Sequence, residues 1–113
     1  MNPRHICCCA LVFGAALLAA PVVHAAGPVY ELGVEAAANY RYAEALMHFK
    51  QAAEQGDRDA RRTLGLMLLY GGQLYGKEVE RNPEQAKRWL RAAANDGCEV
   101  STFMLKGMAA HGG

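Results

Sequence analysis

The feature that constrains this chain most is a segment that it contains twice. The stretch RYAEALMHFKQAAEQG, which ends at Gly56, returns forty-one residues later in diverged form as NPEQAKRWLRAAANDG, which ends at Gly97. In both copies the apolar residues recur every three or four positions, which predicts an amphipathic helix. A short amphipathic helix that occurs twice predicts a helical repeat protein, in which each unit buries its apolar face against its neighbours.

The ends of both helices carry recognisable signals. Asn82 before Pro83 is typical of an N-cap followed by proline in the first turn, and Gln85 is placed to complete a capping box with Asn82. Gly56 and Gly97 follow the last turns, where a positive φ is often required. Each helix therefore has a defined end.

The neighbouring segments supply the helices that cover these two. Residues 57–70 begin with a capping aspartate and are apolar on one side, residues 98–111 repeat that register, and residues 29–38 present Leu32-Gly33 where the second segment presents Leu64-Gly65. No segment shows the alternation of a strand. The sequence predicts an all-α fold: a short α/α superhelical solenoid with two helix-turn-helix repeats, hairpins 29–56 and 57–97, and a C-terminal capping helix at 98–110.

The N-terminus has the pattern of a secretion signal peptide. A short region that contains Arg4 precedes an apolar run over residues 6–20, which is shorter than a membrane-spanning helix. Pro21 ends the run, and Val23 and Ala25 occupy the positions that a signal peptidase reads. We expect residues 1–25 to be removed by cleavage near Ala25 or Ala26, and the mature domain, 26–113, to be periplasmic or secreted. An uncleaved anchor is the alternative.

The mature chain is electrically balanced. Without Arg4 it has eleven basic and eleven acidic side chains. This balance favours neither nucleic acid nor an anionic membrane surface as a partner. We therefore expect no nucleic-acid binding and no stable membrane insertion after cleavage.

The second repeat resembles the Sel1-like repeat family, a branch of the tetratricopeptide-like helical repeats. Its small and aromatic residues agree with that family in order and spacing; they are Ala60, Leu64, Gly65, Gly71, Gly76, Val79, Asn82, Ala86, Trp89, Ala93, Ala94 and Gly97. The first hairpin is similar to a shorter tetratricopeptide unit. The resemblance implies an α/α solenoid that binds a protein or peptide. Lys106 departs from it, because Gly33 and Gly65 stand at the equivalent positions, and this favours a capping role for the last helix.

Residues for catalysis or metal binding are sparse. Ser101 is the only serine and occupies the position of a core alanine, and Cys98, His48 and His111 lack the spacing of a zinc site. The glycines near residue 71 are too irregular for a phosphate-binding loop. We predict no enzymatic activity, no catalytic or metal site and no cofactor, and keep a small secreted hydrolase as a remote alternative.

The segment RRTLGLMLLY is apolar nearly all round, although Leu64 and Leu68 already satisfy the repeat core. Since the first helix of each unit lines the concave face of a helical solenoid, the surplus side chains predict a partner-binding groove. Its residues are Arg62, Leu66, Leu69 and Tyr70, with Tyr75 at the rim of the following loop. The alternative is that the loop, residues 71–80, folds over these side chains and covers them.

Two further surface features are candidates for partner contacts. Lys87, Arg88 and Arg91 form a basic face, on which Glu84 is placed to pair with Arg88. Cys98 is a candidate for an intermolecular disulfide.

The sequence thus predicts an exported, non-catalytic adaptor or scaffold of the cell envelope that binds a protein or peptide. The alternative is a self-associating structural homo-oligomer, a homodimer in the simplest case. It would meet through the two ends of the domain, whose apolar residues are Val29, Tyr30, Leu32, Phe103, Met104 and Met108.

Overall fold

The computed structural model describes residues 26–112, and the predicted signal peptide lies outside these residues. Within them all regular structure is helical. The helices are α2 (Pro28–Ala38), α3 (Tyr42–Glu54), α4 (Arg58–Tyr70), α5 (Gly72–Tyr75), α6 (Pro83–Asn95) and α7 (Glu99–Ala110).

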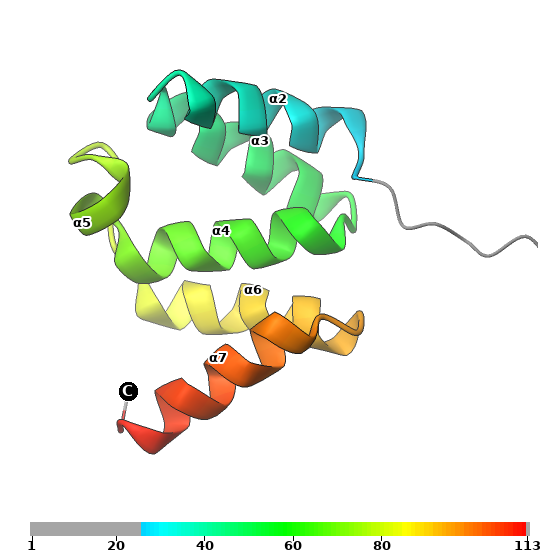
Figure 1. Cartoon of the computed structure of the whole chain (residues 1–113), viewed down its shortest axis with the longest axis vertical. Coiled ribbons are helices and arrows are strands. Elements are labelled where there is room, and N and C mark those ends of the chain that lie inside the picture. The colour runs from blue at the N-terminus through cyan, green and yellow to red at the C-terminus, as the bar shows by residue number, and fades with distance from the viewer. Residues whose placement is uncertain (1–25, 113) are drawn as a thin grey trace, which may run out of the picture.

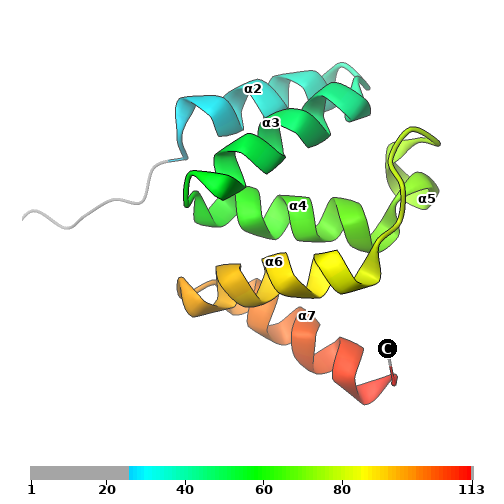
Figure 2. The same cartoon turned by 180° about the vertical axis from the view of Figure 1, so that it is seen from behind.

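The long helices stack in chain order from one end of the molecule to the other (Figures 1 and 2). Helices α2 and α3 form one hairpin, α4 and α6 form the next, and α7 lies against α6. The predicted all-α solenoid of two helix-turn-helix repeats and a closing helix is confirmed. The short helix α5 was not predicted; it lies within the loop that joins α4 to α6.

The core is built mainly from small residues on facing helices. Ala45, Ala53, Ala60, Ala86 and Ala93 have no exposed surface. Small side chains let the helix axes approach closely, and the larger Leu64, Met67 and Leu90 fill the spaces that remain. The alanines that defined the repeat in the sequence are thus its packing surface.

A glycine in the first helix of each hairpin sets the distance to the second helix. A Cβ atom on Gly33 would lie 2.6 Å from the ring of Phe49, and one on Gly65 would lie 2.7 Å from Cγ of Leu90. Phe49 and Leu90 are equivalent residues in the forty-one-residue repeat. Both hairpins therefore use the same contact, a large side chain seated on a glycine.

The helix ends follow the predicted signals, with one change. The Asp57 carboxylate accepts a hydrogen bond from the Ala60 amide at 2.9 Å, and the Asn82 side chain accepts one from the Gln85 amide at 3.1 Å. The Asn82 amide donates to the carbonyl of Leu68 at 2.7 Å. The capping box predicted that the Asn82 backbone amide bonds the side chain of Gln85; it bonds the Leu68 carbonyl of α4 instead. Gly56 and Gly97 have φ angles of 94° and 88°, as expected.

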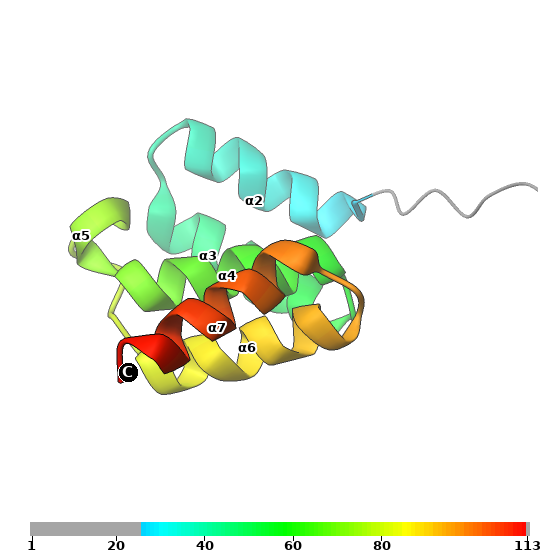
Figure 3. The ribbon, with the colours of Figure 1, turned by 60° about the horizontal axis from the view of Figure 1, so that its bottom comes forward.

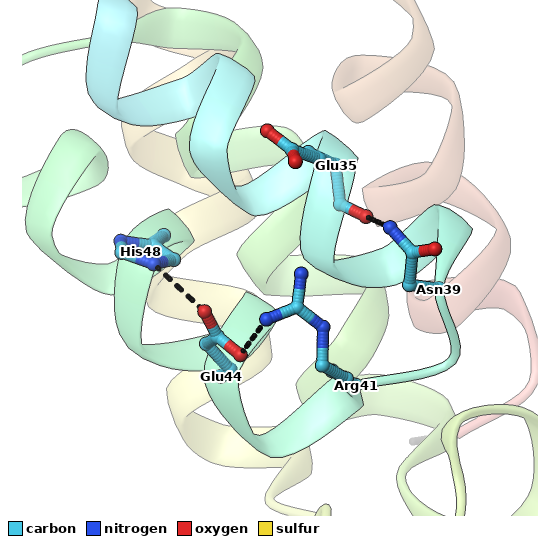
Figure 4. Close-up of polar contacts among 5 residues, drawn as sticks. All are labelled: Glu35, Asn39, Arg41, Glu44 and His48. Carbon is cyan, nitrogen blue, oxygen red and sulfur yellow. Dashed lines mark hydrogen bonds and ion pairs between the residues drawn. The ribbon is translucent and has the colours of Figure 1, made fainter.

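The first hairpin closes with a turn of three residues, 39–41. Figure 4 shows its polar contacts: the Asn39 amide donates to the Glu35 carbonyl at 2.8 Å, and Arg41 pairs with Glu44 at 2.6 Å. His48 lies on α3 one turn after Glu44, and its Nε2 atom is 3.7 Å from the Glu44 carboxylate. Tyr40, within the turn, has a φ angle of 60°, which L-residues rarely adopt.

The second hairpin closes with a longer connection, residues 71–82, which contains α5. The loop is tied to α4 by a hydrogen bond of 2.9 Å from Nε of Arg81 to the Leu69 carbonyl, and by Val79, which is buried. Tyr75 reaches the first hairpin, where its ring meets that of Tyr42 edge-on at 5.7 Å. The loop is thus part of the packed structure and joins the two repeats.

Among residues 26–112, no helix is both long enough and apolar enough to cross a membrane.

Candidate interaction groove

An apolar groove of about 580 Å³ lies between the last turn of α4, the first turn of α6 and the second half of α7; we call it the α4–α7 groove. It is lined by Leu69, Tyr70, Arg81, Pro83, Glu84, Phe103, Met104, Gly107, Met108 and His111. Most of these side chains are apolar, and the charged ones come from α6 and the residues that precede it. The groove therefore combines an apolar floor with a polar edge.

The direction of α7 opens this groove. In Figure 3, α7 lies across α6. Only its start is fully packed: Ser101 is completely buried at the position that Ala60 holds in α4, as the sequence predicted. Further along, Met108 is half-buried, whereas its repeat equivalent, Met67, is 1% exposed. Helix α7 thus carries core-type residues that no other described element covers.

Phe103 is the most prominent of the uncovered residues. Its side chain is 77% exposed, and that of Val100, one turn earlier, is 52% exposed. At the equivalent positions α4 carries Arg62 and Asp59, which form an ion pair at 3.2 Å. The same face of the solenoid is therefore charged on α4 and apolar on α7.

The structure brings together only part of the groove predicted from the sequence. Leu69 and Tyr70 line the α4–α7 groove. Leu66 is half-buried on α4, Arg62 pairs with Asp59, and Tyr75 packs against Tyr42. The sequence left two alternatives, an open binding groove or a loop that covers the surplus apolar side chains, and neither applies to all of them. Met67 belongs to the core, whereas Leu69 packs against the core and also lines the α4–α7 groove.

Several groove residues were not identified as such from the sequence. Phe103, Met104 and Met108 were assigned to a self-association surface, and Gly107, Arg81 and His111 were not singled out for this role. The repeat does point to two of these positions. A shift of forty-one residues aligns Phe103 with Arg62 and His111 with Tyr70, and Arg62 and Tyr70 belong to the predicted groove. It did not show that α7 would leave these positions open.

The residues at the opposite end of the domain are more covered. The Tyr30 ring packs at a tilt of 47° against that of Phe49, with ring centroids 5.3 Å apart, and the Tyr30 hydroxyl lies 3.4 Å from that of Thr63. Val29 also packs against the core, whereas Leu32 is 49% exposed. The apolar surface at the start of the domain is thus small.

The tyrosines around the long loop include one with a shifted pKa. Burial raises the pKa of Tyr75, and the nearby Tyr70 and Tyr42 raise it further. The Tyr75 hydroxyl therefore stays neutral at physiological pH and acts as a packing group.

Cys98 is a free cysteine, 5% exposed, at the N-cap of α7. Ser101 donates a hydrogen bond to its sulfur at 3.3 Å. Burial would raise the pKa of the thiol, but hydrogen bonds from Ser101 and Arg62 outweigh burial and hold the pKa below its usual value. Because the sulfur is enclosed, a disulfide to a second chain would require α7 to move away from the core.

The basic face predicted on α6 is arranged differently from the expectation. Glu84 pairs with Lys87, at 3.6 Å, rather than with Arg88. Positions three and four residues away lie on the same side of a helix, so the sequence alone did not distinguish these partners. Lys87 and Arg91 border a second hollow of about 470 Å³ on the other side of α7, whereas Arg88 lies beside Trp89.

No cluster of three or more potential metal-binding side chains occurs within residues 26–112. Of the two hollows beside α7 in this range, the α4–α7 groove has the more apolar lining and the exposed Phe103.

Comparison with known proteins agrees with this architecture. Two stretches, residues 25–57 and 60–98, match the family model of the Sel1 repeat. They correspond to the two hairpins, and α7 follows the second match. No curated protein and no solved structure matches the chain.

Proposed function

Because the chain belongs to the Sel1 repeat family, whose repeats generally mediate protein–protein interaction, we propose that it is a non-catalytic adaptor that binds a protein or peptide. The observation that carries the proposal is the α4–α7 groove, with Phe103 exposed at its edge. Side chains of this kind, aromatic and uncovered beside an apolar hollow, are typical of the centres of protein interfaces.

The binding face in this proposal is formed by the first helices of successive units. Arg62 of α4 interacts with Cys98 at the start of α7, and Tyr30 of α2 approaches Thr63 of α4. These helices form a continuous face, which widens into the groove where α7 diverges from α6. A partner would bind by surface complementarity, with no bond made or broken.

We place this adaptor in the cell envelope. The support for that location is the signal-peptide pattern of residues 1–25, namely an apolar run with small residues at a cleavage position. Fractionation of cells that express the full chain tests the location, since a cytoplasmic, uncleaved product would contradict it.

Site-specific photo-crosslinking tests the binding function. A photoreactive phenylalanine analogue replaces Phe103 in one variant, Leu66 in a second and, as a control, Met47, which is 65% exposed on α3. We expect Phe103 or Leu66, but not Met47, to give a discrete adduct with another protein in cells that express the chain naturally.

Adducts at the same level from all three positions would contradict a dedicated binding face, as would no adduct from either Phe103 or Leu66. An adduct that contains only two copies of this chain would support the self-associating oligomer instead.

A further inference from the structure

The last turn of α7 contains a glycine, Gly107, whose Cβ position has no neighbouring atom. A Cβ atom on Gly107 would have nothing within 4 Å, and Gly107 lines the α4–α7 groove. Glycine weakens a helix relative to alanine, because it loses more backbone entropy on folding. Among the described residues, no contact compensates α7 for this loss.

The other glycines inside long helices of this chain show what such a position accommodates. Gly33 receives the ring of Phe49, and Gly65 receives the side chain of Leu90, each at a distance that a Cβ atom would prevent. Both contacts join one helix to another. Gly107 stands one position after the register of Gly33 and Gly65, since its repeat equivalent is Leu66. It too leaves room for a side chain, with Phe103 and Met104 one turn before it and His111 one turn after it.

The edge of the groove carries one basic and one acidic side chain, Arg81 and Glu84. Nε of Arg81 is bound to the Leu69 carbonyl, and within residues 26–112 its guanidinium forms no ion pair with a carboxylate. The N-terminus of α6, at Pro83, adds the positive end of a helix dipole. Glu84 is the acidic residue at this edge, and it pairs with Lys87.

We propose that the α4–α7 groove binds an amphipathic helix of another protein, which seats one large apolar side chain on Gly107 and directs an acidic side chain to Arg81. This inference rests on the proposed function and names the chemistry of the partner. The helical form is argued from the helix-on-helix contacts at Gly33 and Gly65, and the acidic residue is argued from Arg81, whose guanidinium pairs with no carboxylate among the described residues.

A second copy of this chain fits the groove less well. The prominent exposed apolar residues of α7 are Phe103 and Val100. Two facing patches of this size would bury roughly a few hundred Å², well below the ~1,200 Å² of a stable protein interface. A single inserted helix buries its apolar side chains inside the groove, so it does not require a wide, flat contact surface.

A displayed library of short amphipathic helical peptides, with varied apolar and charged positions, tests the proposal against the mature protein. The best peptide is synthesised, and its affinity is measured for the wild type, Gly107→Leu and Lys106→Leu. Leucine at 107 fills the seat and is compatible with a helix, so this variant is expected to fold, which circular dichroism verifies. Lys106→Leu adds the same side chain at an exposed position outside the groove.

We expect the selected peptides to share a large apolar residue with an acidic residue about one turn away. Gly107→Leu should weaken binding at least ~10-fold, while Lys106→Leu should leave it within about twofold. Arg81→Glu should also weaken binding, and replacing the acidic residue of the peptide with lysine should restore part of the loss in that variant.

Selected peptides that bind Gly107→Leu as well as the wild type would overturn the inference. If those peptides are lost in Leu66→Glu, the proposed binding face survives and only its partner chemistry is wrong. Failure to enrich any helical peptide would also overturn the inference, and the proposed function would then be judged by the cross-linking experiment alone.

Discussion

Single glycines have opposite effects at different places in this molecule. Gly65 lies in the core contact with Leu90, with the Ala86 carbonyl also near its Cβ position, whereas Gly107 faces open space. The residue type and the helical setting are the same. The surroundings decide whether the missing side chain is a packing requirement or an unfilled position.

This contrast predicts opposite effects of the same substitution. Gly65→Ala should lower the free energy of unfolding by about 1–2 kcal/mol, because the added methyl group displaces Leu90 by more than the gain in helix propensity offsets. Gly107→Ala should raise the free energy of unfolding by up to about 1 kcal/mol, through helix propensity alone. Urea denaturation followed by circular dichroism measures both. Equal effects of the same sign would contradict the packing described for α4 and α6.

At the scale of helices, Asp57 connects elements that are distant in the sequence. One carboxylate oxygen caps α4 through the Ala60 amide, and the other accepts a hydrogen bond of 2.9 Å from the amide of Gly27, just before α2. Asn82 caps α6 through the Gln85 amide alone. Asp57 therefore stabilises both a helix end and the position of the first helix.

Alanine substitutions of Asp57 and Asn82 should distinguish helix capping from the positioning of α2. Asn82→Ala should cost about 1 kcal/mol of unfolding free energy, the usual effect of losing an N-cap. Asp57→Ala should cost about 2 kcal/mol, since a second hydrogen bond is lost with the cap. Hydrogen exchange of the Glu31 amide, which donates to the Gly27 carbonyl, should accelerate in Asp57→Ala and remain unchanged in Asn82→Ala. Unaltered exchange in both variants would show that the contact with Gly27 contributes nothing.

The sequence predicted the helices better than it predicted their surroundings. Periodic alanines, the capping residues Asp57 and Asn82 and the glycines at 56 and 97 specify local structure, and local structure depends on neighbouring residues. The pairing of Asn82 with Leu68, the helical turn α5 and the contact of Tyr75 with Tyr42 depend on how the long loop folds back. Such contacts between distant residues leave no periodic pattern in the chain.

The groove was predictable only in part for a related reason. Leu69 and Tyr70 were found because α4 has more apolar residues than its core needs. Gly107 and His111 became groove residues through the angle at which α7 crosses α6. That angle depends on how the helices pack together, so the sequence of a single helix does not specify it.

For the whole molecule, the surface predicts a monomer in solution. The exposed apolar side chains at the two ends form small patches, Leu32 with Val34 on α2 and Val100 with Phe103 on α7, and Cys98 is enclosed. Light scattering of residues 26–113 over a range of concentrations, with and without reductant, measures the oligomeric state. We expect the mass of one chain throughout, and the same for Cys98→Ser. A dimer that persists in Cys98→Ser would favour the self-associating oligomer.

Among the long helices, α7 has the fewest buried residues, with Ser101 alone, and it packs mainly against α6, whereas α4 lies between α3 and α6. In a solenoid, cohesion comes from contacts between neighbours, so α7 is the element that local unfolding should release at the lowest free energy. Among residues 26–112, the wall of the proposed binding groove is then also the segment that unfolds most easily. A partner that seats on Gly107 would give the second half of α7 another packing surface, and binding would raise the free energy needed to unfold this last helix.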